Sequence, residues 1–388
     1  MTYRIVQLPG DGIGVEVTAA ATRVLEAVSA DSDVTFAWDE RLVGGAAIDE
    51  YGMALRDEDL AACAAADAVL LGAVGGPKWD DPGSPVRPEQ ALFKLRKGLG
   101  LFANLRPITL QPALIDASPL REDRLRGVDL LILRELTGGL YFGKRREAEA
   151  AAAAAAAGEE RSAKDELPYS ESEIRRIVEL AFELASSRRR RVTSVDKANV
   201  LATSRLWRTI AEEVGREHPE IALEHRLVDS FAMQLITQPG AFDVVVTENL
   251  FGDILSDEAS VLTGSLGMLP SASLGNRETE YGRFGMYEPV HGSAPDIAGE
   301  DFANPLGAIL SAAMLLRWSL GLGDLADRIE SAVRTTLSDG YRTRDLAGLD
   351  PAADTEVVGT TSMTDAVIER LQQSPTTADA RPHLEVVR

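Results

Sequence analysis

The sequence has one cysteine, few aromatic residues and no long apolar run. Among its 388 residues Cys63 is the only thiol, so an internal disulfide is excluded and a reducing compartment is indicated. Aromatic residues make up only 5%, so the core must be built from Leu, Val, Ile and Ala. No apolar stretch approaches the roughly 18 residues that span a bilayer, and residues 1–6 lack the basic-then-apolar pattern of a signal peptide. We therefore expect a cytoplasmic protein that does not associate with membranes.

Positive charge is also scarce. Asp and Glu number 61 against 40 Lys and Arg, which gives a formal net charge of −21. Nucleic acids and anionic membranes need a basic face on their partner, so this balance argues against both. An anionic small molecule would need a local cluster of cations that overcomes the repulsive charge of the whole chain.

Short apolar runs alternate with helical patterns along the chain. This alternation predicts an α/β fold with a largely parallel sheet, in two domains or one large unit. The predicted strands are 4–8, 68–71, 130–133, 192–195 and 243–247, and the predicted helices include 16–28, 171–186 and 203–214. An alanine-rich insertion at 147–160 is compatible with a short exposed helix or a flexible segment, and neither carries chemistry.

The segment from Gly10 to Gly14 follows a predicted strand and precedes a predicted helix. Its glycines are spaced Gly-x-Gly-x-Gly, whereas the Rossmann dinucleotide fingerprint is Gly-x-Gly-x-x-Gly. The segment therefore predicts a tight turn between strand and helix, and the fold is not expected to be a Rossmann fold.

Asp253 and Asp257 follow the apolar strand 243–247 and are four residues apart, so they share one face of a helix. Oxygen ligands of this kind suit Mg²⁺ or Mn²⁺. An isolated pair would be two solvated acids. Its place beyond the C-terminal end of a strand, where open α/β sheets bind ligands, favours a metal site.

Three further features have both a structural and a functional interpretation. Lys197 follows the strand-like run 192–195 and is either a surface charge or a proton acceptor. Arg96, Arg106 and Arg134 lie in apolar contexts, and the last two end strand-like runs. Each arginine alone is typical of an ion pair, but three converging guanidinium groups would clamp carboxylates.

Residues 288–299 are rich in Gly, Pro and Ser. They form either a backbone-lined ligand cradle or simply a long loop.

Together these segments resemble the isocitrate/isopropylmalate dehydrogenase family, which oxidises and decarboxylates malate-type 2-hydroxy acids. The resemblance runs from residues 8–14 to the helix after Asn304, and 247–257 and 288–299 are its most specific parts. It implies a two-domain α/β fold with a large, partly parallel sheet. The first domain would comprise residues 1–101 and 264–388. The second, 102–263, would hold the metal site and the dimer contacts, together with the insertion.

The resemblance also implies roles for individual residues. The three arginines would bind the two carboxylates of the malate core. Asp253 and Asp257 would bind Mg²⁺ or Mn²⁺ with Asp229 of a second subunit. Lys197, also from that subunit, would accept the hydroxyl proton, and Tyr141 would protonate the enol carbon. A homodimer with shared active sites would therefore be part of the mechanism. The cofactor residues would be Glu288, His291, Gly292, Ser293, Ala294, Pro295, Asp296, Ile297 and Asn304.

Two local features resemble the isopropylmalate branch of the family and its use of NAD. Glu89, Leu92 and the second subunit's Val200 would face the variable group of the substrate, and the two apolar side chains suit a branched alkyl group. Asp296 would accept hydrogen bonds from ribose hydroxyls and repel a 2′-phosphate. The implied reaction is oxidative decarboxylation of 3-isopropylmalate in leucine synthesis. The alternatives are another alkylmalate, tartrate or malate as substrate, or a non-catalytic subunit with this fold.

Overall fold

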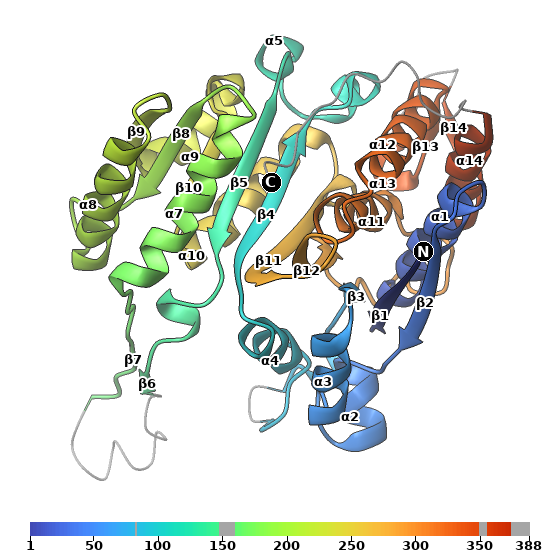
Figure 1. The fold of residues 1–388 in the computed structure, drawn as a ribbon, viewed down its shortest axis with the longest axis horizontal. Helices are drawn as coiled ribbons and strands as arrows, with labels where there is room; N and C mark the ends of the chain where they lie inside the picture. Colours follow the sequence, from blue (N-terminus) through green and yellow to red (C-terminus); the bar gives the residue numbers. More distant parts are fainter. Residues whose placement is uncertain (82–83, 147–159, 349–354, 374–388) are drawn as a thin grey trace.

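The computed structural model describes residues 1–81, 84–146, 160–348 and 355–373, and a ten-stranded sheet dominates them. The strand order is β2-β1-β3-β12-β11-β4-β5-β10-β8-β9 (Figure 1). These strands are β1 (Thr2–Gly10), β2 (Thr35–Glu40), β3 (Ala68–Ala73), β4 (Leu101–Thr109), β5 (Asp129–Glu135), β8 (Arg191–Asp196), β9 (Ala222–Leu227), β10 (Val244–Thr247), β11 (Pro270–Glu278) and β12 (Arg283–Pro289).

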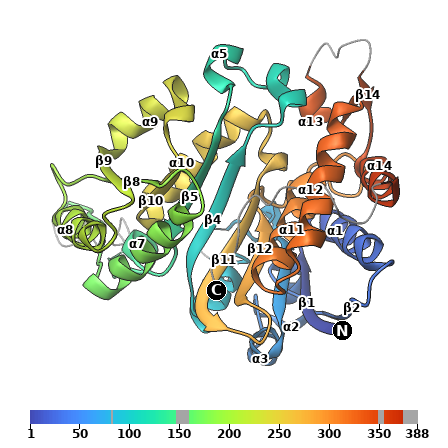
Figure 2. The ribbon, with the colours of Figure 1, turned by 45° about the horizontal axis from the view of Figure 1, so that its top comes forward.

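Helices flank the sheet (Figures 1 and 2), and two short ribbons lie apart from it (Figure 1). The helices are α1 (Gly14–Ser29), α2 (Gly45–Tyr51), α3 (Asp57–Ala65), α4 (Gln90–Gly98), α5 (Glu122–Leu125), α7 (Glu171–Ser186), α8 (Ala202–Glu217), α9 (Val228–Thr237), α10 (Asn249–Ser260), α11 (Leu306–Trp318), α12 (Gly323–Ser338), α13 (Arg344–Ala347) and α14 (Thr360–Gln373). The ribbons pair β6 (Arg145–Arg146) with β7 (Lys164–Asp165), and β13 (Tyr341–Arg342) with β14 (Glu356–Val357). No helix in the described ranges has the length and apolar character needed to cross a bilayer.

The sheet is parallel in its outer parts and antiparallel in its centre. β12, β11, β4 and β5 form the antiparallel part, while β2-β1-β3-β12 and β5-β10-β8-β9 pair in parallel. The predicted partly parallel α/β sheet is confirmed, and so are the five predicted strands and three predicted helices. The predicted turn is also confirmed, because β1 ends at Gly10 and α1 begins at Gly14.

The prediction that Arg106 ends a strand was wrong. β4 continues through Pro107 to Thr109, because these residues pair with Leu131 and Asp129 of β5. Arg106 thus lies within the central part of the sheet. The alanine tract at 147–159 lies outside the described residues, and the domain boundaries stay a prediction.

The two faces of the sheet are covered differently. One continuous apolar core unites α1, α7, α8, α11, α12 and α14 with inward residues such as Leu105, Leu133 and Tyr287. The opposite face carries two smaller cores. One lies under α2 to α4 and includes Val69, and the other lies under α9 and α10 and includes Ile132. Alternation along the strands places Asn104, Arg106 and Arg134 on this second face, toward the gap between its two cores.

Asp11 anchors the turn between β1 and α1. Its buried carboxylate accepts hydrogen bonds from the backbone N–H groups of Gly45, Ala46 and Gly75, at 2.7, 2.8 and 2.8 Å. Three loops that are distant in sequence are therefore joined at one side chain. The adjoining Gly12 has φ +56°, and a Cβ there would lie 2.0 Å from the carbonyl oxygen of Ser293.

Replacement Asp11→Ala should lower the free energy of unfolding by about 2–4 kcal/mol, because it leaves two buried and one half-buried N–H donor without this partner. Urea denaturation of the variant would measure this loss. The exposed Asp33→Ala serves as the matched control and should change stability by less than about 0.5 kcal/mol. Equal effects of the two substitutions would contradict an anchoring role for Asp11.

Candidate active site

Helix α10 carries the two predicted metal ligands and begins at a buried carboxylate. Glu248 caps the helix by accepting hydrogen bonds from the backbone N–H groups of Leu250 at 3.0 Å and Phe251 at 2.9 Å. Burial raises the pKa of the Glu248 carboxyl, and these hydrogen bonds oppose the rise. The cap fixes where α10 starts, and hence the positions of Asp253 and Asp257 one turn apart along the helix.

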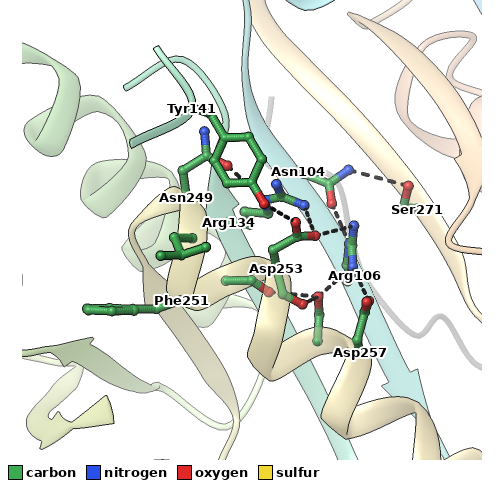
Figure 3. Close-up of polar contacts among 12 residues, drawn as sticks. Asn104, Arg106, Arg134, Tyr141, Asn249, Phe251, Asp253, Asp257 and Ser271 are labelled. Atoms are coloured by element: carbon green, nitrogen blue, oxygen red, sulfur yellow. Dashed lines mark hydrogen bonds and ion pairs between the residues drawn. The ribbon is translucent and has the colours of Figure 1, made fainter. Parts of the chain in front are cut away.

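Two buried arginines of the central strands meet these carboxylates (Figure 3). Arg134 of β5 forms an ion pair with Asp253, and its Nε donates to Asn249 Oδ1 at 3.0 Å. Arg106 Nη1 of β4 lies 3.1 Å from Asp257 Oδ1 and donates to Ser256 Oγ at 2.5 Å. Strand alternation and the cap of α10 thus bring together four charged groups from three elements that are far apart in sequence.

Burial changes the acidity of these groups. Desolvation lowers the pKa of the Arg134 guanidinium to about 10, and the neighbouring Arg106 adds to this effect. Desolvation also raises the pKa of the Asp257 carboxyl, with repulsion from Asp253 acting in the same direction and Arg106 opposing it. Additional negative charge would favour the charged form of the arginines, and additional positive charge would favour ionised Asp257.

Tyr141 joins the same cluster from the short helical turn Gly139–Tyr141. Its hydroxyl donates to Asp253 Oδ2 at 2.5 Å, and the Arg134 guanidinium lies 5.4 Å from the ring centroid. Burial raises the pKa of the Tyr141 hydroxyl, and the hydrogen bond to Asp253 raises it further. The phenol is therefore held in its protonated form, as a proton donor requires.

Helix α4 brings the third predicted arginine to the same face of the sheet. Arg96 Nη2 lies 3.2 Å from Glu288 Oε1, and its buried Nε has no hydrogen-bond partner in the described part of the chain. Phe93 of the same helix lies 6.3 Å from the Tyr141 ring, measured between centroids. Glu89 and Leu92, the predicted substrate residues, lie just before α4 and in its first turn. A Cβ on Gly75 would lie 3.3 Å from Glu89 Oε1, so Glu89 points toward that loop.

The predicted cofactor loop follows β12 and packs on the β1–α1 turn. The Ser293 carbonyl accepts from the backbone N–H of Ile13 at 2.8 Å. His291 Nδ1 lies 2.9 Å from the Gly292 carbonyl oxygen, while its buried Nε2 has no partner within the described ranges. Asn304 uses its side chain to bond Leu306 N and Asp345 Oδ2, each at 3.0 Å. The unpartnered imidazole nitrogen fits a loop that holds a polar ligand.

Lys197, Asp229 and Val200 form a separate group. Lys197 Nζ lies 2.6 Å from Asp229 Oδ1, and this bond lowers the pKa of the Asp229 carboxyl. Among the described residues, no group of three His, Cys, Asp or Glu side chains could hold a metal ion. Asp253 and Asp257 supply oxygen atoms of the kind that Mg²⁺ takes. A third carboxylate would have to come from elsewhere, as the expected role of Asp229 in a second subunit requires.

Known proteins are similar to this chain in sequence and in fold. The family model described as isocitrate/isopropylmalate dehydrogenase matches residues 4–367. The chain belongs to the isocitrate/isopropylmalate dehydrogenase family. The 3-isopropylmalate dehydrogenase of Anaeromyxobacter dehalogenans is 57% identical over 371 residues, which cover 96% of this chain and 100% of that protein. The corresponding protein of Heyndrickxia coagulans is 54% identical over 384 residues, 99% of this chain and 100% of its own.

A solved structure agrees with the family assignment. The isocitrate dehydrogenase of Methylococcus capsulatus superposes with a TM-score of 0.82 at 36% identity, and the match covers 96% of this chain and 100% of that one. The predicted isocitrate/isopropylmalate dehydrogenase fold is therefore confirmed. The cluster around Asp253 is the part of this fold that could carry the chemistry of the family.

Several residues of the candidate active site were not predicted from the sequence. Asn104, Asn249 and Ser256 each bond one of the two central arginines, and Glu248 caps α10. A signal existed for Asn104, since it lies two residues before Arg106 and shares its face of the strand. Glu248 directly follows an apolar strand and precedes a helix, a common place for a cap.

Gly252 permits α10 to lie directly against Arg134. A Cβ on this residue would lie 2.7 Å from both Arg134 Cβ and Cγ. Replacement Gly252→Ala should therefore shift the helix, weaken the predicted binding of Mn²⁺ several-fold and lower the free energy of unfolding by about 1–3 kcal/mol. Calorimetric titration and urea denaturation would measure the two effects.

Gly240→Ala is the matched control, because a Cβ there meets only the Arg126 carbonyl oxygen at 3.7 Å. Unchanged Mn²⁺ affinity in the Gly252 variant, with the control also unchanged, would contradict a close fit between α10 and Arg134.

Proposed function

We propose that this protein catalyses the oxidative decarboxylation of 3-isopropylmalate to 4-methyl-2-oxopentanoate in leucine biosynthesis, with NAD and Mg²⁺ or Mn²⁺. The observation that carries the proposal is the meeting of Arg106 and Arg134 with Asp253, Asp257 and Tyr141 on one face of the sheet. Full-length relatives named 3-isopropylmalate dehydrogenase, at 57% and 54% identity, support the choice of substrate.

The three arginines bind the two carboxylates of the malate core. Each guanidinium presents several N–H donors in a fixed plane and so suits a carboxylate better than an ammonium group does. Arg106 and Arg134 are only 7% and 3% exposed, so their attraction for an anion is weakly screened by solvent. The positive charge of these arginines would offset the repulsion that an anionic substrate meets from a chain with a net charge of −21.

Asp253 and Asp257, with Asp229 of a second subunit, would hold the divalent cation. When bound, the cation polarises the oxygen on the carbon that is oxidised and neutralises negative charge that develops as carbon dioxide leaves. Lys197 of the second subunit, in its neutral amine form, would accept the hydroxyl proton, and NAD would supply the acceptor for the hydride of the same carbon. Tyr141 then donates a proton to the carbon that lost its carboxylate, because its hydroxyl is kept protonated beside Asp253.

Sharing of these residues requires a homodimer, and exposed apolar side chains support one. Val200, Met233 and Ile254 are 62%, 65% and 58% exposed, and they lie beside Lys197, on α9 and on α10. Such side chains gathered around the elements of one site are typical of an interface. Burial of these elements against a second copy would bring Lys197, Asp229 and Val200 to the partner's Arg106 and Asp253.

Specificity for substrate and cofactor is proposed from two further places. Leu92 and the second subunit's Val200 offer an apolar surface to the isopropyl group, and Glu89 would repel a third carboxylate. Asp296 in the loop after β12 would bond the adenosine ribose and repel a 2′-phosphate, which favours NAD. We propose that residues 1–101 with 264–388 and residues 102–263 form two domains that close over these ligands, in a cytoplasmic enzyme.

The proposed activity predicts NADH formation from 3-isopropylmalate only when a divalent cation is present. Absorbance at the NADH band would be followed with purified protein, NAD and Mg²⁺ or Mn²⁺, with EDTA as the metal-free comparison. Isocitrate, malate, tartrate and other alkylmalates would be assayed in parallel. Turnover of one of these instead of 3-isopropylmalate would refute the substrate, and silence on all of them would favour a non-catalytic subunit.

Shared sites predict that two inactive variants restore each other. Lys197→Ala and Tyr141→Phe homodimers should each lose at least about 100-fold in kcat, because each lacks one proton-transfer group. After random mixing of subunits, one site in each heterodimer contains both native residues, so activity should return to about a quarter of the wild-type value. Mixing without denaturation and refolding is the control, and no recovery after verified exchange would show that Lys197 acts within its own chain.

A further inference from the structure

Asn104 is buried beside Arg106 and Ser271 (Figure 3). It lies on β4 and is 1% exposed. Its Oδ1 accepts a hydrogen bond from Arg106 Nε at 2.7 Å, and its Nδ2 lies 3.1 Å from Ser273 Oγ and 3.3 Å from Ser271 Oγ. Every polar atom of the amide is therefore engaged, and none of these contacts belongs to a residue proposed to react.

Strand register explains this arrangement. Ser273 of β11 and Arg134 of β5 are the direct cross-strand neighbours of Asn104 in the two antiparallel pairs. Arg106 follows two residues later on the same strand, so its side chain leaves on the same face. A row of polar side chains thus crosses the sheet in the gap between the two smaller apolar cores.

The neighbouring hydroxyl fixes the direction of the amide. Ser271 donates its only hydroxyl hydrogen to the Glu288 carbonyl oxygen at 3.0 Å, so toward Asn104 it acts as an acceptor. Only the nitrogen side of the amide can satisfy it, which turns the oxygen toward Arg106. The orientation is therefore set by β11 and β12 and does not depend on a ligand.

The hydrogen bond from Arg106 Nε to Asn104 restricts the orientation of the whole guanidinium plane. With Nε bound to Asn104, Nη1 of Arg106 donates to Ser256 and Asp257 of α10, and Nη2 lies 3.7 Å from Asp253 Oδ1. A free arginine side chain loses considerable rotamer freedom when it binds an anion, and fixing it beforehand removes much of that cost. The gain appears in binding of the carboxylate that Arg106 contacts, in ground state and transition state alike.

We propose that Asn104 is a positioning residue that orients Arg106 for the dicarboxylate substrate, and this role rests on the proposed function of the site. A positioning role predicts a rise in KM for the acid with little change in kcat, because uniform binding is lost. It also predicts rescue by aspartate, which keeps an acceptor for Arg106 Nε and accepts from the Ser273 hydroxyl, and from Ser271 once that hydroxyl turns away from the Glu288 carbonyl oxygen.

The test compares full-length wild type with Asn104→Leu, Asn104→Asp and Leu105→Ala. Leucine is similar in shape to asparagine but cannot accept the bond, so KM for 3-isopropylmalate should rise about tenfold. KM for NAD and kcat should stay within about threefold of wild type. Asn104→Asp should stay within about threefold for all constants. Leu105→Ala perturbs the opposite face of the same strand and should lower the melting temperature without the selective rise in KM.

Binding measured without turnover separates the two proposals. Calorimetry with Mg²⁺ would record the affinity of each protein for 3-isopropylmalate and for malate, which carries the same two carboxylates. A wild type that binds these acids without oxidising them refutes the proposed reaction, while tenfold weaker binding by Asn104→Leu alone still supports positioning. Equal affinities of wild type and Asn104→Leu overturn the positioning role, as does an aspartate variant that binds as weakly as the leucine variant.

If Asn104→Leu does not fold, the aspartate variant and a Ser271→Ala/Ser273→Ala double variant decide the question. The double variant is expected to weaken binding severalfold. Wild type that binds neither acid overturns both proposals.

Discussion

Burial of two guanidinium groups is the constraint on which the site depends. An unpaired charge taken out of water costs several kcal/mol, so Arg106 and Arg134 must find both counter-charges and hydrogen-bond acceptors inside the protein. Asp253 and Asp257 supply the charges, and Asn104, Asn249 and Ser256 accept further N–H groups. Each of these partners comes from an element whose position is otherwise fixed by apolar packing, so the fold and the site stabilise each other.

The mixed sheet provides the place where such a cluster can exist. The inner parallel strands β1, β3, β8 and β10 are largely buried on both faces, whereas the antiparallel strands β12, β11 and β4 pack on the large core with one face and reach the two small cores on the other only through residues such as Leu101, Ile108 and Met286. On the other face the two small cores stand apart, and inward-facing polar residues such as Ser271, Ser273 and Glu288 fill the sheet between them. Antiparallel strands tolerate one polar face, which parallel strands covered by helices do not.

The same difference decides what could be predicted from the sequence. β3, β5 and β10 are buried on both faces and therefore appear as continuous apolar runs, and they were predicted together with β8, in which Val192 and Val195 enclose Thr193 and Ser194. β4, β11 and β12 interleave polar residues and glycine with apolar ones, so their extent was missed. Asp253 and Asp257 could be singled out because their spacing is local, and their role as metal ligands stays a prediction. Asp11 and Asn104 were missed because their partners lie far away in the sequence, and the roles of Lys197 and Asp229 stay predictions because they involve a second chain.

Charge balance explains how an acidic protein can accommodate a dianion. Surface carboxylates farther from the site than a Debye length of about 8 Å are largely screened, while the buried arginines would act on a bound acid at contact distance. Without ligands, the arginines and aspartates neutralise each other across β4, β5 and α10. A dicarboxylate would add two negative charges and a divalent cation two positive ones, so the pair leaves the net charge of the site unchanged. Either ligand alone would leave buried charge uncompensated, and joint binding is therefore favoured over binding of one.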